Sequence, residues 1–296
     1  MSIAFAYLSV ILIWSTTPLA IKWSAAGSGF AFAVMARMGI GASLGAILVA
    51  LLHGGLPLHR RARASYLAAG LGMFGAMLCT YWGAQYVNSG LVSVLFGLAP
   101  LVTGVFAVLW LGEPALQPSK VAGMVLGLAG LAVISAGGTE LGGVHARAGI
   151  SALLVAVVIY SASLVWVKRI ADDSPPLATS TGSLLVALPL FITAWAMADG
   201  HLPHAVPVRA GIAIVYLGVF GSVVSFTLYY YIIRHLEAGR VVLVTLVTPV
   251  LALMLGNVAN GEPITARVLL GAACITTGLA MHQWRAVVAL LRAPRG

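Results

Sequence analysis

The sequence consists of long apolar runs separated by short segments that carry the charges. A transmembrane helix needs about 20 mostly apolar residues, and dividing the chain at its charges and Pro/Gly clusters leaves ten such runs. We place them at residues 3–22, 30–53, 64–87, 90–111, 120–138, 148–168, 176–198, 209–233, 241–260 and 266–286. The runs are continuously apolar and do not alternate, which favours helices over the strands of a β-barrel. We therefore predict an all-α protein with ten transmembrane helices in a lipid bilayer.

Composition supports the same interpretation. Of the 296 residues, 61% are hydrophobic and 8% are charged, whereas a soluble domain of this size needs more charge to cover its surface. The formal net charge is +9, but the basic residues are scattered between apolar runs and form no stripe with interleaved aromatics. Such scatter is typical of topology signals, so we expect no nucleic-acid partner.

The lysines and arginines also predict an orientation. With the N-terminus in the cytoplasm, eleven of them fall on the cytoplasmic side and four on the outside. An excess of Lys and Arg is typical of cytoplasmic loops, and an even number of spans returns the C-terminus to the same side. We expect a multi-pass protein of the bacterial inner (plasma) membrane with both termini inside.

The tripeptide Gly-Glu-Pro occurs twice, in "LWLGEPALQP" around Glu113 and in "VANGEPITAR" around Glu262. At this offset of 149 residues (262 minus 113), further pairs coincide, namely Tyr81 with Tyr230, Gly90 with Gly239, and Pro100 with Pro249. Upstream, "WSTTPLAIK" (14–22) is similar to "YSASLVWVK" (160–168). The pattern predicts two copies of a five-helix unit, residues 1–140 and 145–290, which together form one membrane domain. Because five is odd, the second copy is inverted in the membrane.

Inverted repeats are typical of secondary transporters, whose substrate site lies near the membrane midplane where the repeats meet. In each copy a mid-span proline is followed by Gly-Glu-Pro and a Gly-rich helix, and Arg37 lies early in the second span. With the "WSTTPLAIK" start, this order resembles the EamA-type members of the drug/metabolite transporter superfamily over nearly the whole chain. The resemblance implies ten helices around a central cavity that works by alternating access. Length and aromatic-rich spans are most similar to aromatic amino-acid exporters of that family, which implies amino-acid substrates.

The side chains that could line such a cavity are aromatic, polar or kinking residues on shared helix faces within the spans. They are Trp14, Pro18, Tyr81, Gln85, Tyr160, Ser163, Trp166, Phe226 and Tyr230. Tyr and Trp combine a large apolar area with one polar group, which suits a zwitterion with an apolar side chain. The same residue types also anchor helices at membrane interfaces, and that alternative stays open.

Arg37 lies inside a span, roughly 10 Å from its outer end at a rise of about 1.5 Å per residue. Charge within a membrane is costly and functional by default, so Arg37 is a candidate partner for a substrate carboxylate. Alternatively, its side chain snorkels outward or holds carbonyls at a helix end. Pro100 and Pro249 occupy equivalent mid-span positions and predict kinks, which are either hinges for transport or fixed bends that serve packing.

All seven acidic residues fall in predicted loops or at span ends. No carboxylate is therefore expected in mid-membrane, which argues against proton coupling through such a group and against a site dedicated to cations. Glu113 and Glu262 would lie on opposite membrane faces and cannot form a catalytic pair. We find no metal-ligand spacing, nucleophile elbow or P-loop, and expect no enzymatic activity, no cofactor and no metal.

We thus predict a monomeric secondary transporter that exports small metabolites, most favourably amino acids including aromatic ones. The alternatives are an exporter of other amphipathic metabolites, nucleosides or drugs, and a lipid flippase. A flippase would need a groove that opens sideways to lipid.

Overall fold

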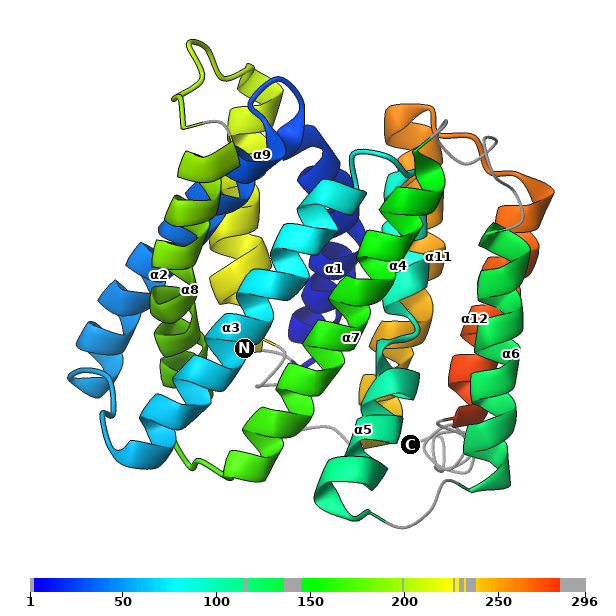
Figure 1. Ribbon diagram of the computed structural model, residues 1–296, viewed down its shortest axis with the longest axis horizontal. Coiled ribbons are helices and arrows are strands. Elements are labelled where there is room, and N and C mark those ends of the chain that lie inside the picture. Colours follow the sequence, from blue (N-terminus) through cyan, green and yellow to red (C-terminus); the bar gives the residue numbers. More distant parts are fainter. Residues whose placement is uncertain are drawn as a thin grey trace.

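The computed structural model describes residues 3–113, 117–135, 145–198, 200–225, 227–228, 232 and 238–282, and all regular structure among them is helical. In chain order the helices are α1 (Ile3–Ala25), α2 (Phe30–His53), α3 (Arg60–Gly83), α4 (Ser89–Phe96), α5 (Ala99–Leu111), α6 (Pro118–Ser135), α7 (Ala146–Ile170), α8 (Pro176–Ala198), α9 (Val208–Gly218), the π-helical η2 (Val219–Val224), α11 (Ala238–Asn260) and α12 (Ala266–His282) (Figure 1).

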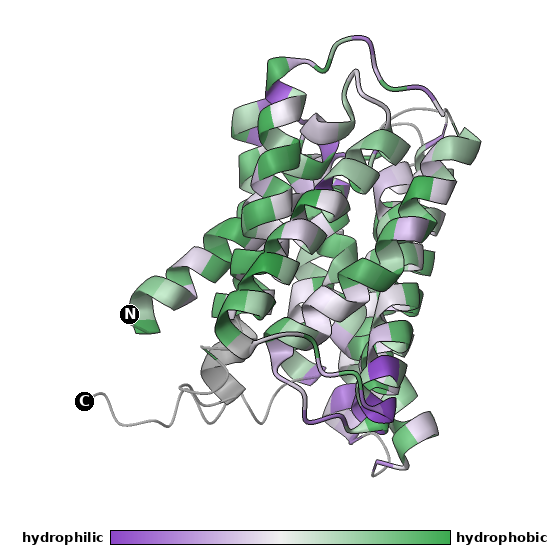
Figure 2. Ribbon diagram, turned by 90° about the vertical axis from the view of Figure 1, so that its left-hand side faces the viewer, coloured by the Kyte–Doolittle hydropathy of each residue, from purple (hydrophilic) through white to green (hydrophobic). Residues whose placement is uncertain are grey.

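These elements form ten apolar spans. The helices α4 and α5 are two halves of one span, and α9 continues directly into η2. Within the described residues, six helical stretches are long and apolar enough to cross a membrane, and four shorter apolar helices complete the set. Hydrophobic residues form a band across the middle of the molecule, and hydrophilic residues gather mainly toward its two ends (Figure 2). The all-α, ten-span prediction is confirmed, and the side on which the termini lie stays a prediction.

Among the described helix ends, most predicted boundaries agree to within three residues, and two spans differ more. The third begins at Arg60 instead of residue 64, because the basic side chains of the first turn can remain in the interface while the helix continues inward. The fourth was expected to be continuous over 90–111 but is interrupted between Phe96 and Ala99. Pro100 follows the interruption, in the first turn of α5.

The helices pack as two interlocked halves. Helix α1 packs against α9 and α11, and α7 correspondingly packs against α3 and α5. The pairs α2 with α8, α4 with α11, and α6 with α12 each join spans of equal rank in the two halves. This is the contact pattern that a two-fold relation between two five-helix units requires. The ends of the two units, at 140 and 145, stay predictions.

The two Gly-Glu-Pro segments end their helices in the same way. Gly112 follows α5 and Gly261 follows α11, each with a φ of +64°, in the left-handed region that glycine adopts without strain. The amide of the next glutamate donates to a carbonyl six residues earlier, at 3.4 Å in the first segment and 3.1 Å in the second. The space around both glycines is open, so backbone conformation and not crowding explains the residue type.

The contact between α6 and α12 depends on small residues. A methyl group on Gly278 would lie 2.5 Å from the carbonyl oxygen of Gly123, and one on Gly130 would lie 2.6 Å from that of Gly271. The two backbones therefore approach to direct contact, which glycine permits in membrane helices.

We predict that Gly278→Ala lowers the stability of the folded protein by about 1–3 kcal/mol, since the added methyl group meets backbone that cannot move aside cheaply. The thermal unfolding midpoint in detergent measures the effect. Gly211→Ala is the matched control, because its methyl group would meet only Val206, at 3.9 Å. Equal midpoints for the two variants would contradict the close approach of α6 and α12.

Candidate functional site

A cavity of about 910 Å³ lies between the two halves of the molecule. Six of the residues predicted to bind substrate or to act as hinges line it. They are Trp14, Pro18, Arg37 and Pro100 from the first half, and Tyr160 and Pro249 from the second. The cavity is thus bounded by both repeats, where an inverted-repeat transporter places its substrate.

Four other predicted residues lie away from the cavity. Tyr81 is fully buried in the core beside Arg37. Gln85 is exposed after the end of α3 and donates to the Trp82 carbonyl. Spacing along a helix identifies residues that share a face, but it does not identify which face points inward, and this explains the difference.

The other two lie on α7. The Ser163 hydroxyl donates to the Ala68 carbonyl oxygen at 3.0 Å and joins α7 to α3. Trp166 is 58% exposed on the outer surface, with its ring edge-on to Trp110. Phe226 and Tyr230 lie outside the described residues.

Small hydroxyl residues complete the lining and were not predicted. They are Thr17, Thr80, Ser93, Thr103, Ser119, Thr245 and Thr248. Two of them directly precede a lining proline, Thr17 before Pro18 and Thr248 before Pro249. Hydroxyl residues beside mid-span prolines were therefore a signal in the sequence that could have found part of this set.

The two equivalent prolines have different backbones. In the first half, α4 ends at Phe96, the chain makes a turn, and Pro100 lies in the first turn of α5. In the second half, Pro249 lies within α11, which continues through it. Proline removes one helical hydrogen bond at either place, yet only the span of the first half is interrupted. The hinge role of both prolines stays a prediction.

One end of the cavity reaches the membrane face at Glu113. The Lys168 ammonium donates to the Glu113 carboxylate at 2.7 Å, and both side chains are well exposed. This hydrogen bond and the charge of Lys168 lower the pKa of the Glu113 carboxyl, with a smaller contribution from Lys120. Lys120 and His282 also line this end, which is therefore polar and predominantly basic.

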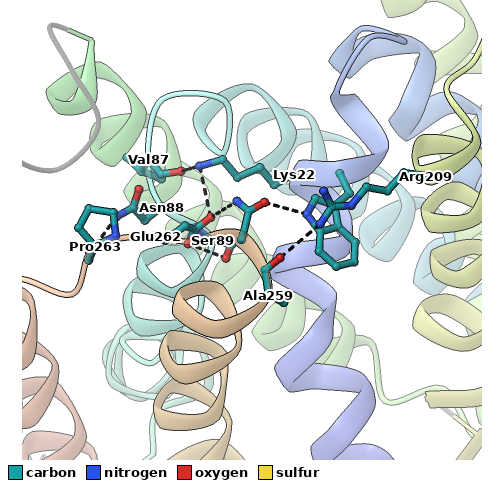
Figure 3. A network of polar contacts seen from close by, with 10 residues as sticks. Lys22, Val87, Asn88, Ser89, Arg209, Ala259, Glu262 and Pro263 are labelled. Carbon is teal, nitrogen blue, oxygen red and sulfur yellow. Dashed lines mark hydrogen bonds and ion pairs between the residues drawn. The ribbon is translucent and has the colours of Figure 1, made fainter.

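The opposite end is closed by a network around Glu262, whose side chain is 7% exposed (Figure 3). The Glu262 carboxylate accepts hydrogen bonds from the Ser89 amide at 2.7 Å and the Ser89 hydroxyl at 2.8 Å. It also accepts from the Asn260 amide at 2.9 Å and forms an ion pair with Lys22 at 3.5 Å. Since Ser89 is the first residue of α4, the carboxylate sits at the positive end of a helix.

Further contacts extend the closure across the same face. Lys22 donates to the Val87 carbonyl at 2.8 Å, and the Trp23 indole donates to Asn260 at 3.1 Å. The Arg209 guanidinium lies 3.8 Å from the centre of the Trp23 ring. The network joins α1, α4, α9 and α11, and no residue of it lines the cavity.

We predict that Glu262→Ala destabilises the protein by about 3 kcal/mol, because it leaves the Lys22 charge without a counter-ion and the buried Ser89 donors without an acceptor. Glu113→Ala is the matched control in the other Gly-Glu-Pro segment and should cost about 0.2–1 kcal/mol, as for an exposed ion pair. Detergent thermal unfolding measures both. Equal losses would show that burial of Glu262 does not distinguish the two faces.

Comparison with known proteins agrees with this architecture. The model of the EamA-like transporter family matches residues 1–136 and 147–282. An uncharacterized transporter of Archaeoglobus fulgidus is 28% identical over 71% of this chain and 74% of its own length. A probable terminal-alkyne amino-acid exporter of Streptantibioticus cattleyicolor is 27% identical over 93% of this chain and 91% of its own. A crystal structure with 23% identity covers 99% of both chains at a TM-score of 0.66 and shares the fold. The chain belongs to the EamA-like transporter family, and is a multi-pass membrane transporter of small molecules and not an enzyme.

Proposed function

We propose that this protein exports small metabolites, above all amino acids with apolar or aromatic side chains, by alternating access. One observation carries the proposal. A cavity bounded by both halves reaches the Glu113 face of the membrane, while the Glu262 network closes the opposite face. A transporter that alternates between two faces must hold one closed while the other is open.

The lining favours an amphipathic substrate. Trp14, Phe96 and Tyr160 supply aromatic surface, and the lining hydroxyls supply hydrogen-bonding groups among them. A site of this kind fits a molecule that carries a polar head and an apolar body. The name of the relative in Streptantibioticus cattleyicolor, an amino-acid exporter, supports this class of substrate.

We place the Glu113 face in the cytoplasm and both termini with it, on the distribution of lysine and arginine. In this orientation the structure corresponds to a state open to the inside of a bacterial inner membrane, ready to load a cytoplasmic substrate. The acidic residues that the structure describes, Glu113, Asp172, Asp173 and Glu262, all lie outside the helices. This supports export down a gradient without proton exchange at a mid-membrane carboxylate. We expect a monomer to suffice, since both halves of the cavity belong to one chain.

The two glutamates suggest how the protein changes from the state open at one membrane face to the state open at the other. Lys22 and Lys168 stand at equivalent positions of the repeat, and each pairs with the Gly-Glu-Pro glutamate of the other half. In the proposed cycle the Glu262–Lys22 pair separates, and the opposite face closes around the existing Glu113–Lys168 pair, as the helices bend near Pro100 and Pro249. The broken α4–α5 span and the continuous α11 are then the two alternative forms of one element.

The two closures are not equally strong in this proposal. Gly256 leaves room for the Glu262 carboxylate, since a methyl group there would lie 2.5 Å from its oxygen. The corresponding residue in the first half is Ala107, and Ser89 corresponds to Ala238. Burial of Glu113 would therefore meet a methyl group and lack a hydroxyl donor. This difference favours the state that is open at the Glu113 face.

A flux measurement tests the function. In liposomes that contain the purified protein and labelled phenylalanine, we expect protein-dependent efflux down the gradient, unchanged when the pH is equal on both sides. A labelled nucleoside loaded in the same way is the comparison. Efflux of the nucleoside without efflux of any amino acid would refute the proposed substrate, and a requirement for a proton gradient would refute the uncoupled mechanism.

An accessibility measurement tests the closure. In a chain with Cys79 and Cys274 replaced by alanine, Ser93→Cys places one thiol in the cavity lining. We expect an impermeant thiol reagent to label it from the cytoplasmic face only. Adding Gly256→Ala should increase labelling from outside, roughly tenfold for every 1.4 kcal/mol lost from the closed state. Gly211→Ala is the control, and equal outside labelling in both variants would contradict the role of the Glu262 network.

A further inference from the structure

We infer that Arg37 binds the carboxylate of the substrate, and that this carboxylate, and not the amino group, is the feature on which recognition depends. The substrate class is then amphipathic carboxylates with or without an amine. The inference rests on the proposed transport function, but it makes a separate claim about which chemical group the cavity selects.

Arg37 is buried beside the cavity, and the described groups that contact its guanidinium are uncharged. The residue lies on α2, is 5% exposed and lines the cavity. Its guanidinium contacts the Ser222 hydroxyl, the Tyr81 hydroxyl and the Gly221 carbonyl, each at 3.5 Å. All three partners are uncharged, and the distances exceed the usual range of about 2.7–3.2 Å for such hydrogen bonds. The neighbours hold the side chain in place without neutralising its charge.

Arg37 differs from the lysines that form ion pairs in this molecule. Lys22 and Lys168 lie near helix ends, and each has a carboxylate partner. Arg37 is more deeply buried than either, yet within the described part of the chain no carboxylate pairs with it. A buried charge without a counter-ion is costly in protein and in lipid. An anion that enters the cavity would supply the missing partner.

Arginine is also the side chain best suited to this role. Its planar guanidinium presents two parallel N–H groups that match the two oxygens of a carboxylate. A carboxylate bound there would be held near the closed end of the cavity, with the apolar body of the substrate directed toward Trp14 and Tyr160.

Within the described lining, the amino group meets no carboxylate at the depth of Arg37. The one carboxylate among the described lining residues is Glu113, which lies at the open end and is already paired with Lys168. Deeper in the cavity, the polar side chains other than Arg37 are hydroxyls, such as those of Thr17, Ser93 and Thr248. An ammonium can donate to hydroxyls, but so can a neutral group of the same size. Among the described lining residues, the charged ones are Arg37, Lys120 and Lys168 against Glu113. The potential therefore attracts anions and disfavours amines that lack a carboxylate.

The test uses two analogues of phenylalanine that each lose one group. L-phenyllactate keeps the carboxylate and has a hydroxyl in place of the amine, and L-phenylalaninol keeps the amine and has a hydroxymethyl group in place of the carboxylate. We measure the concentration at which each halves phenylalanine flux through the full-length protein in liposomes. Phenyllactate should compete within roughly tenfold of phenylalanine itself, and phenylalaninol should compete at least about a hundredfold more weakly, the range that a lost charge-assisted contact gives.

Substitutions then assign the preference to Arg37. Arg37→Gln should abolish the difference between the two analogues, and Arg37→Lys, which keeps the charge but not the paired donors, should retain part of it. A purely structural role for Arg37 would lower flux without changing the ratio of the two inhibition constants. Arg147→Gln, on the exposed start of α7, is the control and should leave the ratio unchanged.

The outcomes separate this inference from the proposed function. Phenylalanine transport that phenylalaninol inhibits as well as phenyllactate does would refute the role of Arg37 and leave amino-acid export intact. Transport of labelled phenyllactate without transport of any amino acid would support the carboxylate site and refute amino-acid export. An unchanged ratio in a folded Arg37→Gln or Arg37→Lys protein would refute the inference even where transport persists.

Discussion

The interior of a lipid bilayer supplies no water, so every backbone group and every charge within it must find its partner inside the protein. This constraint explains the helices, which pair their own backbone groups, and the glycines that let α6 and α12 approach closely. It also explains why hydrophilic residues gather mainly toward the two ends of the molecule (Figure 2). The need for a partner is greatest for the charges that are nevertheless buried. Glu262 accepts hydrogen bonds from several donors, whereas the described neighbours of Arg37 are uncharged and 3.5 Å away.

Gly-Glu-Pro occurs at both membrane faces, but its glutamate is exposed at one face and buried at the other. Gly112 and Gly261 end their helices with the same backbone conformation, yet the glutamate that follows is exposed in one case and buried in the other. The difference arises from the neighbours, because the second half provides Gly256 and the first half provides Ser89. The repeated motif thus determines that the helix ends in the same way in both halves. The surrounding residues determine whether that helix end closes the membrane face of the cavity.

The candidate site was predictable in kind and only partly in detail. Trp14, Tyr160 and the two mid-span prolines line the cavity as their positions in the repeat suggested. Trp166 has the same residue type and a similar depth in its span, but it lies on the outer surface. Residue type and helical spacing are equal for a side chain that faces the cavity and for one that faces lipid, since both surroundings are apolar. The amphipathic pattern that orients helices in soluble proteins is therefore weak here.

The class of the protein could be inferred from local sequence patterns alone. Continuous apolar runs require membrane helices, an odd number of spans in each repeat inverts the second half, and the repeated Gly-Glu-Pro anchors the alignment of the two. Only the tertiary structure decided which face is closed, that the span at Pro100 breaks while the span at Pro249 continues, and that Arg37 borders a cavity without an acidic partner among the described residues. These properties depend on contacts between the two halves. Local patterns cannot specify them, because each half contains nearly the same pattern.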